Sequence, residues 1–283
     1  MNKNRQRASY LSTAFITFIG IFSRMKPVMW RWFYNRLARE DKNNQLLLMN
    51  YGFSDPATTP AVLDNTLDTE QELYRYPIQL YQHVVNSVNI QNKNIAEVGC
   101  GRGGGAAYIA RHYQPAMLTA IDLSNKAIEW CKQYHHADNL SFAQGSADKL
   151  PLSNSNIDAV INIESSHCYP SLGDFISEVG RVLKPNGYLL TCDMRTQAKL
   201  DLFRKHIEDT GLKIIHEQNI TPQVLTALDA MSEDRSQSIG KTVPRLFRKT
   251  IRDFVAIQGT PIYDMLQDGR LMYYSHVCQM SDS

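Results

Sequence analysis

Cysteine is scarce in this 283-residue chain, and no pair of cysteines has the spacing of a metal site. None of the five forms a CxxC pair with another: Cys100, Cys131, Cys168, Cys192 and Cys278. The sequence therefore contains no zinc or iron–sulfur motif. An odd, scattered set of thiols is typical of a reducing compartment, because disulfide frameworks need paired cysteines. We predict free thiols, no metal site and a cytoplasmic protein.

A charge excess of either sign is also missing. Lys and Arg total 30 and Asp and Glu total 28, which leaves a net charge of +2. Proteins that bind a phosphate backbone usually concentrate positive charge, so this balance does not favour nucleic acid. The chain also lacks an Asn/Asp-Pro-Pro-aromatic motif that would hold a flipped base. We predict no nucleic-acid partner.

Acidic residues are absent from residues 1–39, and no apolar run there is long enough to span a membrane. Eight basic residues surround the uncharged stretch 8–23, whereas a spanning helix needs about 20 apolar residues. The motif SRMKP follows where a secretory signal would have a small-residue cleavage site. Residues 1–39 therefore fit a basic amphipathic segment that lies on a membrane surface or covers an apolar substrate. An ordinary helix packed on the domain fits them equally well.

Beyond residue 94, strand-like and helix-like segments alternate. Strands are predicted at residues 95–98, 117–122, 140–145, 157–163, 188–193 and 212–220. Helical patterns separate them, and the motif KPNG is expected to end the helix predicted at 172–183. This alternation predicts an α/β protein with a Rossmann-like, doubly wound sheet.

A helical pattern also separates the sixth predicted strand from the seventh. Residues 221–267 read mostly as helix, and residues 270–280 alternate like a late antiparallel strand. This arrangement predicts a seven-stranded sheet with an inserted helical lid over a substrate. We therefore divide the chain into an N-terminal amphipathic or lid segment, 1–75, and a main domain, 76–283.

The lysine of a phosphate-binding loop is missing from the glycine-rich stretch GCGRGGG, residues 99–105. Glycines let a ligand lie against backbone amides at the start of a helix. Glu97, just before the loop, would repel a pyrophosphate but attract an ammonium or sulfonium group. Asp122 ends the next strand, where a carboxylate can accept both ribose hydroxyls or can simply cap the following helix. This pair of acids predicts S-adenosylmethionine and not a dinucleotide.

Four motifs extend this interpretation to a family. AEVGCGRGGG, AID, GSADKLPL and EVGRVLKPNGYLL resemble the successive motifs of class I S-adenosylmethionine-dependent methyltransferases. The resemblance implies that Glu97, Gly99 and Gly101 contact the methionine arm and that Asp122 contacts the ribose. Leu123 would pack on the adenine, with Ser146 and Ala147 at its edge; Asp148 is the alternative to Ser146. The other implied cofactor contacts are Tyr51 in MNYGF, Cys100, Gly103 and Glu164.

A narrower resemblance covers most of the chain. WRWFYN, ESSHCYP, FVAIQGTPI and LQDGRLMYY are similar to segments of the phthiotriol and phenolphthiotriol dimycocerosate methyltransferases of mycobacteria. That family methylates a hydroxyl on a long polyketide-derived lipid, which implies an O-methyltransferase for a lipid-like small molecule. A C-methyltransferase of the sterol or quinone type remains an alternative. So do a rearrangement or cyclisation enzyme that holds the cofactor, and a membrane-surface module with a vestigial glycine loop.

An oxygen acceptor would benefit from a base, and His167 is the best candidate. It follows the fourth predicted strand, at the carboxyl edge of the sheet, and an ordinary pKa of about 6.5 would leave it largely neutral at pH 7. Asp193, which closes the fifth strand, is predicted to orient this histidine or to bind the hydroxyl. Glu164 is the reserve candidate, and Cys168 is interpreted as packing. Each of these residues can instead support the loop or cap a strand end.

Overall fold

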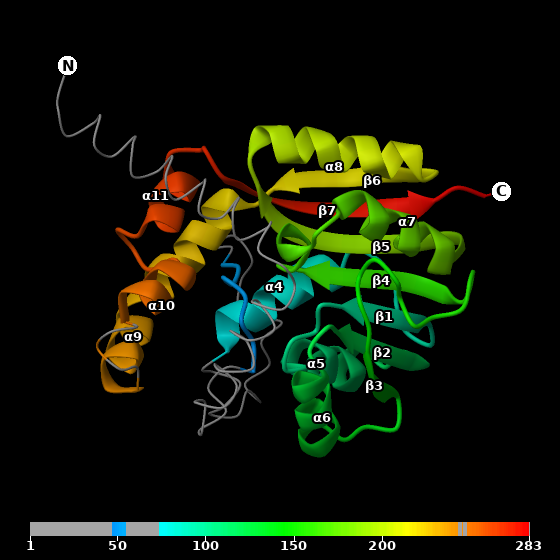
Figure 1. Cartoon of the computed structure of the whole chain (residues 1–283), viewed down its shortest axis with the longest axis horizontal. Helices are drawn as coiled ribbons and strands as arrows, with labels where there is room; N and C mark the ends of the chain where they lie inside the picture. The colour runs from blue at the N-terminus through cyan, green and yellow to red at the C-terminus, as the bar shows by residue number, and fades with distance from the viewer. Residues whose placement is uncertain (1–46, 55–73, 243–244, 246–247, 283) are drawn as a thin grey trace.

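The computed structural model describes residues 47–54, 74–242, 245 and 248–282 (Figure 1). The expectations for residues 1–39, including membrane contact, lie outside these residues, as does most of the 1–75 segment. In the described part of the chain, no helix is long and apolar enough to cross a membrane.

The seven strands form one sheet in the order β3-β2-β1-β4-β5-β7-β6. Neighbours among the first five strands pair in parallel, and β7 runs antiparallel to both β5 and β6. The strand order reverses between β1 and β4, which is where ligands bind in open α/β sheets. The predicted doubly wound, seven-stranded sheet is therefore confirmed. The strands span β1 Asn94–Val98, β2 Met117–Asp122, β3 Leu140–Gln144, β4 Ile157–Ile163, β5 Leu183–Arg195, β6 Leu212–Asn219 and β7 Met272–Met280.

Helices cover both faces of the sheet and bury two apolar clusters. On one face, α4, α5 and α6 join the cluster that contains Leu80, Ile109 and Ile128; on the other, α7 and α8 bury Phe175 and Phe203. The helices on these two faces span α4 Arg75–Val85, α5 Gly104–Tyr113, α6 Asn125–Tyr134, α7 Leu172–Val182 and α8 Gln197–Asp209.

Strand β5 is longer than its sequence pattern predicted. Helix α7 ends at Val182, and the strand begins at Leu183, so the KPNG residues lie inside the strand and not between two elements. Leu183 pairs with Ile157, and a register shift follows before Tyr188 pairs with Ala159. At the other end, pairing with β7 continues to Arg195. This extension carries β5 two residues past Asp193.

Among the residues that the structure describes between β6 and β7, three helices are found: α9 Thr221–Thr242, α10 Arg248–Phe254 and α11 Pro261–Gln267. Figure 1 shows them grouped together at one side of the sheet, with α9 leading directly out of β6. Their position in the chain matches the expected insertion at 221–267, whose role as a substrate lid stays a prediction. Leu228 of α9 and Leu266 of α11 join the cluster of buried residues that includes Tyr51.

Candidate active site

The glycine-rich loop leaves β1 in a conformation that favours glycine. Gly99 has φ +83° and Gly101 has φ +56°, values at which side chains with a Cβ are strained. A Cβ on Gly99 would also lie 2.3 Å from Oγ of Ser165. The backbone N–H groups of Gly99 and Cys100 donate to the carbonyl oxygen of Ile121, at 2.8 and 3.1 Å. The loop is thus held between the ends of β2 and β4.

Asp122 is fixed at the end of β2 by two backbone donors. Its Oδ2 accepts from the N–H of Gly101 at 2.9 Å, and its Oδ1 accepts from the N–H of Ser124 at 2.8 Å. Burial raises the pKa of this carboxyl, and the two backbone hydrogen bonds oppose the rise. Asp122 therefore stabilises the turn of the glycine loop and still presents its carboxylate to the space above the sheet.

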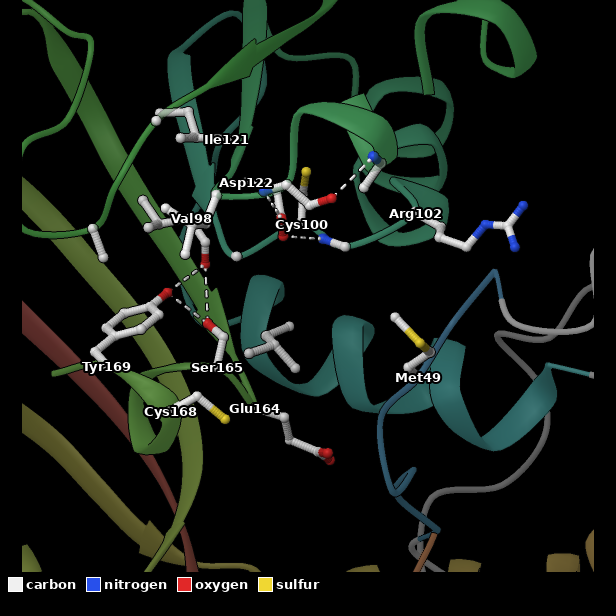
Figure 2. A pocket seen from close by; sticks show the side chains of 18 of the residues that line it. Met49, Val98, Cys100, Arg102, Ile121, Asp122, Glu164, Ser165, Cys168 and Tyr169 are labelled. Carbon is white, nitrogen blue, oxygen red and sulfur yellow. Dashed lines mark hydrogen bonds between the residues drawn. The ribbon is translucent and has the colours of Figure 1, made fainter. Parts of the chain in front are cut away.

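A cavity of about 250 Å³ opens beside this loop (Figure 2). Eight of the predicted site residues line it: Gly99, Cys100, Gly101, Asp122, Leu123, Ser146, Ala147 and Glu164. Five others do not: Tyr51, Glu97, Gly103, His167 and Asp193. The alternative contact Asp148 lines the cavity too, as does Cys168, which was interpreted as packing. Figure 2 shows Glu164 and Cys168 reaching into the space below the glycine loop, with Met49 across from them.

Glu97 lies behind the cavity wall, fully buried at 1% exposure. Its Oε1 accepts from the hydroxyl of Tyr81 at 2.7 Å, and Tyr81 itself lines the cavity. Its Oε2 is buried without a hydrogen-bond partner among the described residues. Burial raises the pKa of Glu97 to about 7, although the hydrogen bond from Tyr81 acts in the opposite direction. A buried carboxylate oxygen without a donor is costly, and a cationic ligand would relieve that cost.

Gly103 has a structural reason of its own. Its φ is +71°, and a Cβ there would lie 2.6 Å from the ring of Phe142. The residue caps the start of α5 in the left-handed conformation. Phe142 therefore occupies the space that a side chain at position 103 would need, and this contact accounts for the glycine.

Glu164 joins three segments that are far apart in the sequence. It follows β4 with φ +47°, a strained value for a residue with a side chain. Its Oε1 accepts from the backbone N–H of Tyr51 at 2.6 Å and from the hydroxyl of Tyr273. Burial raises the pKa of Glu164 to about 7, and the hydrogen bonds from Tyr273 and Tyr51 oppose the rise. Arg235 of α9 holds the same N-terminal segment through the carbonyl oxygen of Asn50, at 3.1 Å.

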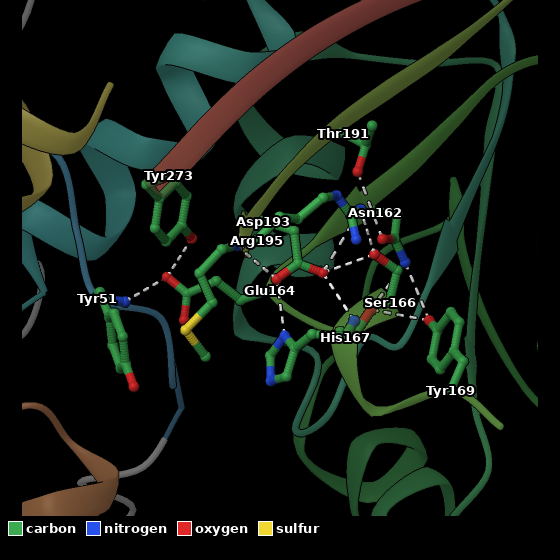
Figure 3. A network of polar contacts seen from close by, with 12 residues as sticks. Tyr51, Asn162, Glu164, Ser166, His167, Tyr169, Thr191, Asp193, Arg195 and Tyr273 are labelled. Atoms are coloured by element: carbon green, nitrogen blue, oxygen red, sulfur yellow. Dashed lines mark hydrogen bonds and ion pairs between the residues drawn. The ribbon is translucent and has the colours of Figure 1, made fainter. Parts of the chain in front are cut away.

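His167 and Asp193 form a hydrogen-bonded pair (Figure 3). Nδ1 of His167 lies 2.7 Å from Oδ1 of Asp193, and the imidazole side chain is 24% exposed whereas the carboxylate is fully buried. Oδ2 of Asp193 accepts from the hydroxyl of Ser166 at 2.6 Å and from the backbone N–H of His167 at 2.9 Å. Short helix η2, Ser166–Cys168, sets these donors against the end of β5.

The protonation state of His167 differs from the sequence prediction. Burial alone would lower its pKa, but the adjacent Asp193 carboxylate raises it well above the ordinary value. Burial would likewise raise the pKa of Asp193, but His167 and Arg195 hold it well below the usual range. The buried anion beside His167 therefore favours the imidazolium form, and the ordinary pKa assumed from the sequence does not apply to this ring.

Several residues at this site have no signal in the sequence that identifies them. The backbone of Leu47 lies 2.6 Å from the Cβ position of Gly104, and the ring of Tyr81 lies 1.9 Å from that of Gly105. These contacts explain why the glycine run continues into α5: the chain's own segments approach the helix as closely as a ligand would. Within ESSHCYP, Ser165 and Tyr169 hydrogen-bond each other at 2.8 Å and line the cavity.

Comparison with known proteins identifies similar chains along nearly the full length. The family model described as "Methyltransferase domain" matches residues 96–191. The phthiotriol/phenolphthiotriol dimycocerosates methyltransferase of Mycobacterium leprae is 32% identical over 262 residues, which is 92% of this chain and 94% of that one. The fatty-acid O-methyltransferase of Mycolicibacterium smegmatis is 34% identical over 223 residues, 78% and 79% of the two chains.

Solved structures of the same fold include methyltransferases that hold S-adenosylmethionine or S-adenosylhomocysteine. One is the geranyl diphosphate C-methyltransferase from Streptomyces coelicolor, with a TM-score of 0.62 and 17% identity. The match covers 87% of this chain and 97% of that one. At this identity the likeness concerns the fold alone.

Proposed function

The chain belongs to the S-adenosylmethionine-dependent methyltransferases, in the family of the phthiotriol/phenolphthiotriol dimycocerosates enzymes, and we propose that it methylates a hydroxyl of a lipid-like or polyketide-derived molecule. The observation that carries the proposal is the His167–Asp193 pair at 2.7 Å. A histidine with a buried carboxylate partner is an arrangement suited to removing a proton from an alcohol. The names of the mycobacterial relatives support a lipid as the acceptor.

The residues around the cavity fit the cofactor. Glu97 lies behind the cavity wall that includes Gly99, Gly101 and Tyr81, and its unpartnered Oε2 would attract the ammonium group of the methionine arm. Asp122 would accept the ribose hydroxyls, and the partly exposed Leu123 would pack on the adenine. When bound, S-adenosylmethionine supplies a methyl group that its sulfonium charge already activates. The protein therefore has to position the acceptor, exclude water and prepare the oxygen.

Proton removal falls to His167. Its Nδ1–H donates to Asp193, which leaves Nε2 as the nitrogen that can take a proton. The acceptor O–H bond breaks as the Nε2–H bond forms, and Asp193 stabilises the resulting imidazolium. The partly exposed ring then returns the proton to solvent. A positioned base of this kind contributes about 10²–10⁴-fold to a rate.

The raised pKa of His167 sets the direction of the pH dependence. Only the neutral imidazole can act as the base, so kcat for an alcohol acceptor is expected to increase as the pH rises through the pKa of His167. A carboxylate acceptor is already a nucleophile and gains nothing from a base. Its methylation is therefore expected to be insensitive to the same titration.

The test uses a donor with a trideuterated methyl group, a panel of long-chain alcohols and fatty acids, and mass spectrometry to locate the label. We expect the label on an alcohol oxygen, and a loss of about 100-fold or more in kcat for His167→Ala and Asp193→Asn. His112→Gln, on the exposed face of α5, is the matched control and should retain activity. S-adenosylhomocysteine affinity should be unchanged in all three variants.

Three outcomes would contradict the proposal. Label on a carbon would assign a C-methyltransferase. Label that stays on the donor while the substrate is converted would assign a rearrangement or cyclisation enzyme. Full alcohol methylation by both His167→Ala and Asp193→Asn would remove the base from the mechanism.

A further inference from the structure

Behind the His167–Asp193 pair lies a buried arginine. Arg195 is the last residue of β5, and only 3% of it is exposed. Its Nη2 donates to Oγ of Ser166 at 2.8 Å and lies 3.9 Å from Oδ2 of Asp193. The guanidinium carbon lies 4.6 Å from the ring centroid of Phe203 on α8. Figure 3 shows Asp193 between Arg195 and His167, with Ser166 completing the network.

The position of this charge needs an explanation, because a buried cation is costly unless it is paired. Its nearest carboxylate is Asp193, which also serves His167. On the other side, burial and the charge of Arg195 together lower the pKa of His276 on β7 to about 4. His276 is therefore neutral and cannot compete for Asp193. The fold thus places one carboxylate, Asp193, between the guanidinium of Arg195 and the imidazole of the proposed base.

The two oxygens of Asp193 have different hydrogen-bond partners. Oδ2 receives the hydroxyl of Ser166, the backbone N–H of His167 and the longer-range charge of Arg195. Oδ1 receives Nδ1 of His167 and the backbone N–H of Met194 at 2.8 Å. The donors on Oδ2 orient the carboxylate toward the imidazole. The positive charge of Arg195 offsets part of the negative charge that holds a proton on the ring.

We propose that Arg195 is a positioning residue for methyl transfer, which acts through Ser166 and Asp193 to orient His167 and to limit how tightly the imidazole holds its proton. The catalytic meaning of this role rests on the function proposed above. Without Arg195, Asp193 would act on His167 with its full charge. The base would then be neutral only at a higher pH, and less of it would be available near neutrality.

Other ionisable groups face the same network. They come from the end of β4, from η2 and from strands β5 and β7: Glu164, Cys168, Cys192, Tyr273 and His276. A substitution at position 195 leaves these residues in place, but it removes the charge that helps to lower the pKa of His276. The resonance of His276 is therefore followed beside that of His167, so that the two titrations are assigned separately.

The direct test follows the Cε1–H resonance of His167 by NMR in histidine-labelled protein, from pH 5 to 10. In Arg195→Met we expect the midpoint to rise by roughly one pH unit. Arg195→Lys keeps the charge and should shift the midpoint by less than half as much. Arg204→Met removes an arginine that pairs with Glu217 of β6, and should leave the midpoint unchanged. An Arg195→Met midpoint within about 0.2 of the wild type, or below it, would overturn the proposal.

Activity adds a second measurement. The pH profile of kcat for Arg195→Met should move upward with the NMR midpoint, while KM stays the same. An NMR shift without a shift in the kcat profile would support the electrostatic role of Arg195 and contradict His167 as the base, so the two proposals fail separately. If Arg195→Met does not fold, Ser166→Ala removes the linking hydroxyl and should raise the midpoint by a smaller amount. A midpoint that stays constant or falls in Ser166→Ala would overturn the relay.

Discussion

Replacing Glu97 with glutamine is expected to make the cofactor-free protein more stable at pH 8 and to weaken its binding of S-adenosylhomocysteine. The reason is the buried Oε2, which has no hydrogen-bond partner among the described residues. Glutamine keeps an oxygen for the hydroxyl of Tyr81, which donates to Oε1 at 2.7 Å. It removes the negative charge that the fold has to bury above neutral pH. A gain in stability together with a loss of binding would show that Glu97 is present for the ligand and not for the stability of the fold.

The magnitude follows from the two pKa values of this carboxyl. Its pKa rises from an ordinary 4.5 to about 7 in the folded protein. Below pH 4.5 the group is protonated in both states and costs nothing. Between 4.5 and 7 the folded state keeps the proton that the unfolded state loses, so stability falls as the pH rises. A difference of one pKa unit corresponds to about 1.4 kcal/mol. Ionised Glu97 therefore lowers the free energy of unfolding by roughly 3 kcal/mol above pH 7.

The assay is urea denaturation of wild type and Glu97→Gln at pH 5 and pH 8. The difference in unfolding free energy between the two proteins should change by about 2 to 3 kcal/mol between these pH values, in favour of the variant at pH 8. The burial of a neutral amide is the same at both pH values and cancels. Glu164 is present in both proteins and cancels as well.

Calorimetric titration completes the test. Wild type should bind S-adenosylhomocysteine more tightly at pH 8 than at pH 6, with proton release, because the ligand's ammonium pairs with the ionised carboxylate. The variant should bind more weakly and lose most of that pH dependence. If Glu97→Gln is equally or more destabilised at pH 8 than at pH 5, the carboxylate is not held unpaired and the reasoning is refuted.

Three further results are expected, at the cavity and in the helices α5 and α9. Asp122→Ala should weaken S-adenosylhomocysteine binding by at least about tenfold, because it loses the proposed ribose acceptor and the two hydrogen bonds from backbone N–H groups, one of which holds the glycine loop; an unchanged Kd in calorimetry would contradict this. Gly105→Ala should destabilise the fold by about 1 to 3 kcal/mol in urea, because its Cβ would lie 1.9 Å from the ring of Tyr81, whereas Gly240→Ala, with open space around it, should stabilise α9 slightly. Maleimide should label Cys168 alone among the five thiols of the native protein, and S-adenosylhomocysteine should slow that labelling, because the other four are buried; labelling unaffected by the ligand would place Cys168 outside its site.

Periodicity was sufficient to predict the sheet because each parallel strand is a short apolar run bounded by turn residues. The buried stretch Ile157–Ile163 was predicted with the bounds that the structure shows. Strand β5 was predicted too short because Lys184 and Asn186 are polar, the first half-buried and the second exposed, and nothing local indicates that Leu183 pairs with Ile157. The antiparallel insertion of β7 between β5 and β6 depends on contacts across the whole C-terminal third. Only its alternation was visible in the sequence.

The site, like the sheet, has a part that could be predicted from the sequence and a part that could not. Acids at strand ends could be predicted because parallel strands end at one edge of the sheet, so Glu97 and Asp122 were assigned to one cofactor and Asp193 was paired with His167. Other groups that hydrogen-bond to residues of the site come from distant segments of the chain. Tyr273 reaches Glu164 from 109 residues away, and Arg235 reaches the carbonyl oxygen of Asn50 from 185 residues away. No local pattern marks such contacts, because they arise only when the insertion and the N-terminal segment pack against the sheet.

Four neighbouring strands, β2, β1, β4 and β5, each carry a carboxylate near their carboxyl ends, and the pKa values of the four carboxyls are shifted in different directions. Burial raises the pKa of the acids after or near the ends of β1, β2 and β4, whereas Asp193 of β5 is held ionised by His167 and Arg195. Without a bound cation, the raised pKa values of Glu97 and Glu164 favour the protonated forms and relieve the repulsion among the acids. We expect a cationic ligand to favour the ionised forms instead, so that the edge of the sheet gains negative charge when the positively charged donor binds. Because S-adenosylhomocysteine lacks the sulfonium charge, we expect these carboxylates to favour the donor over the product.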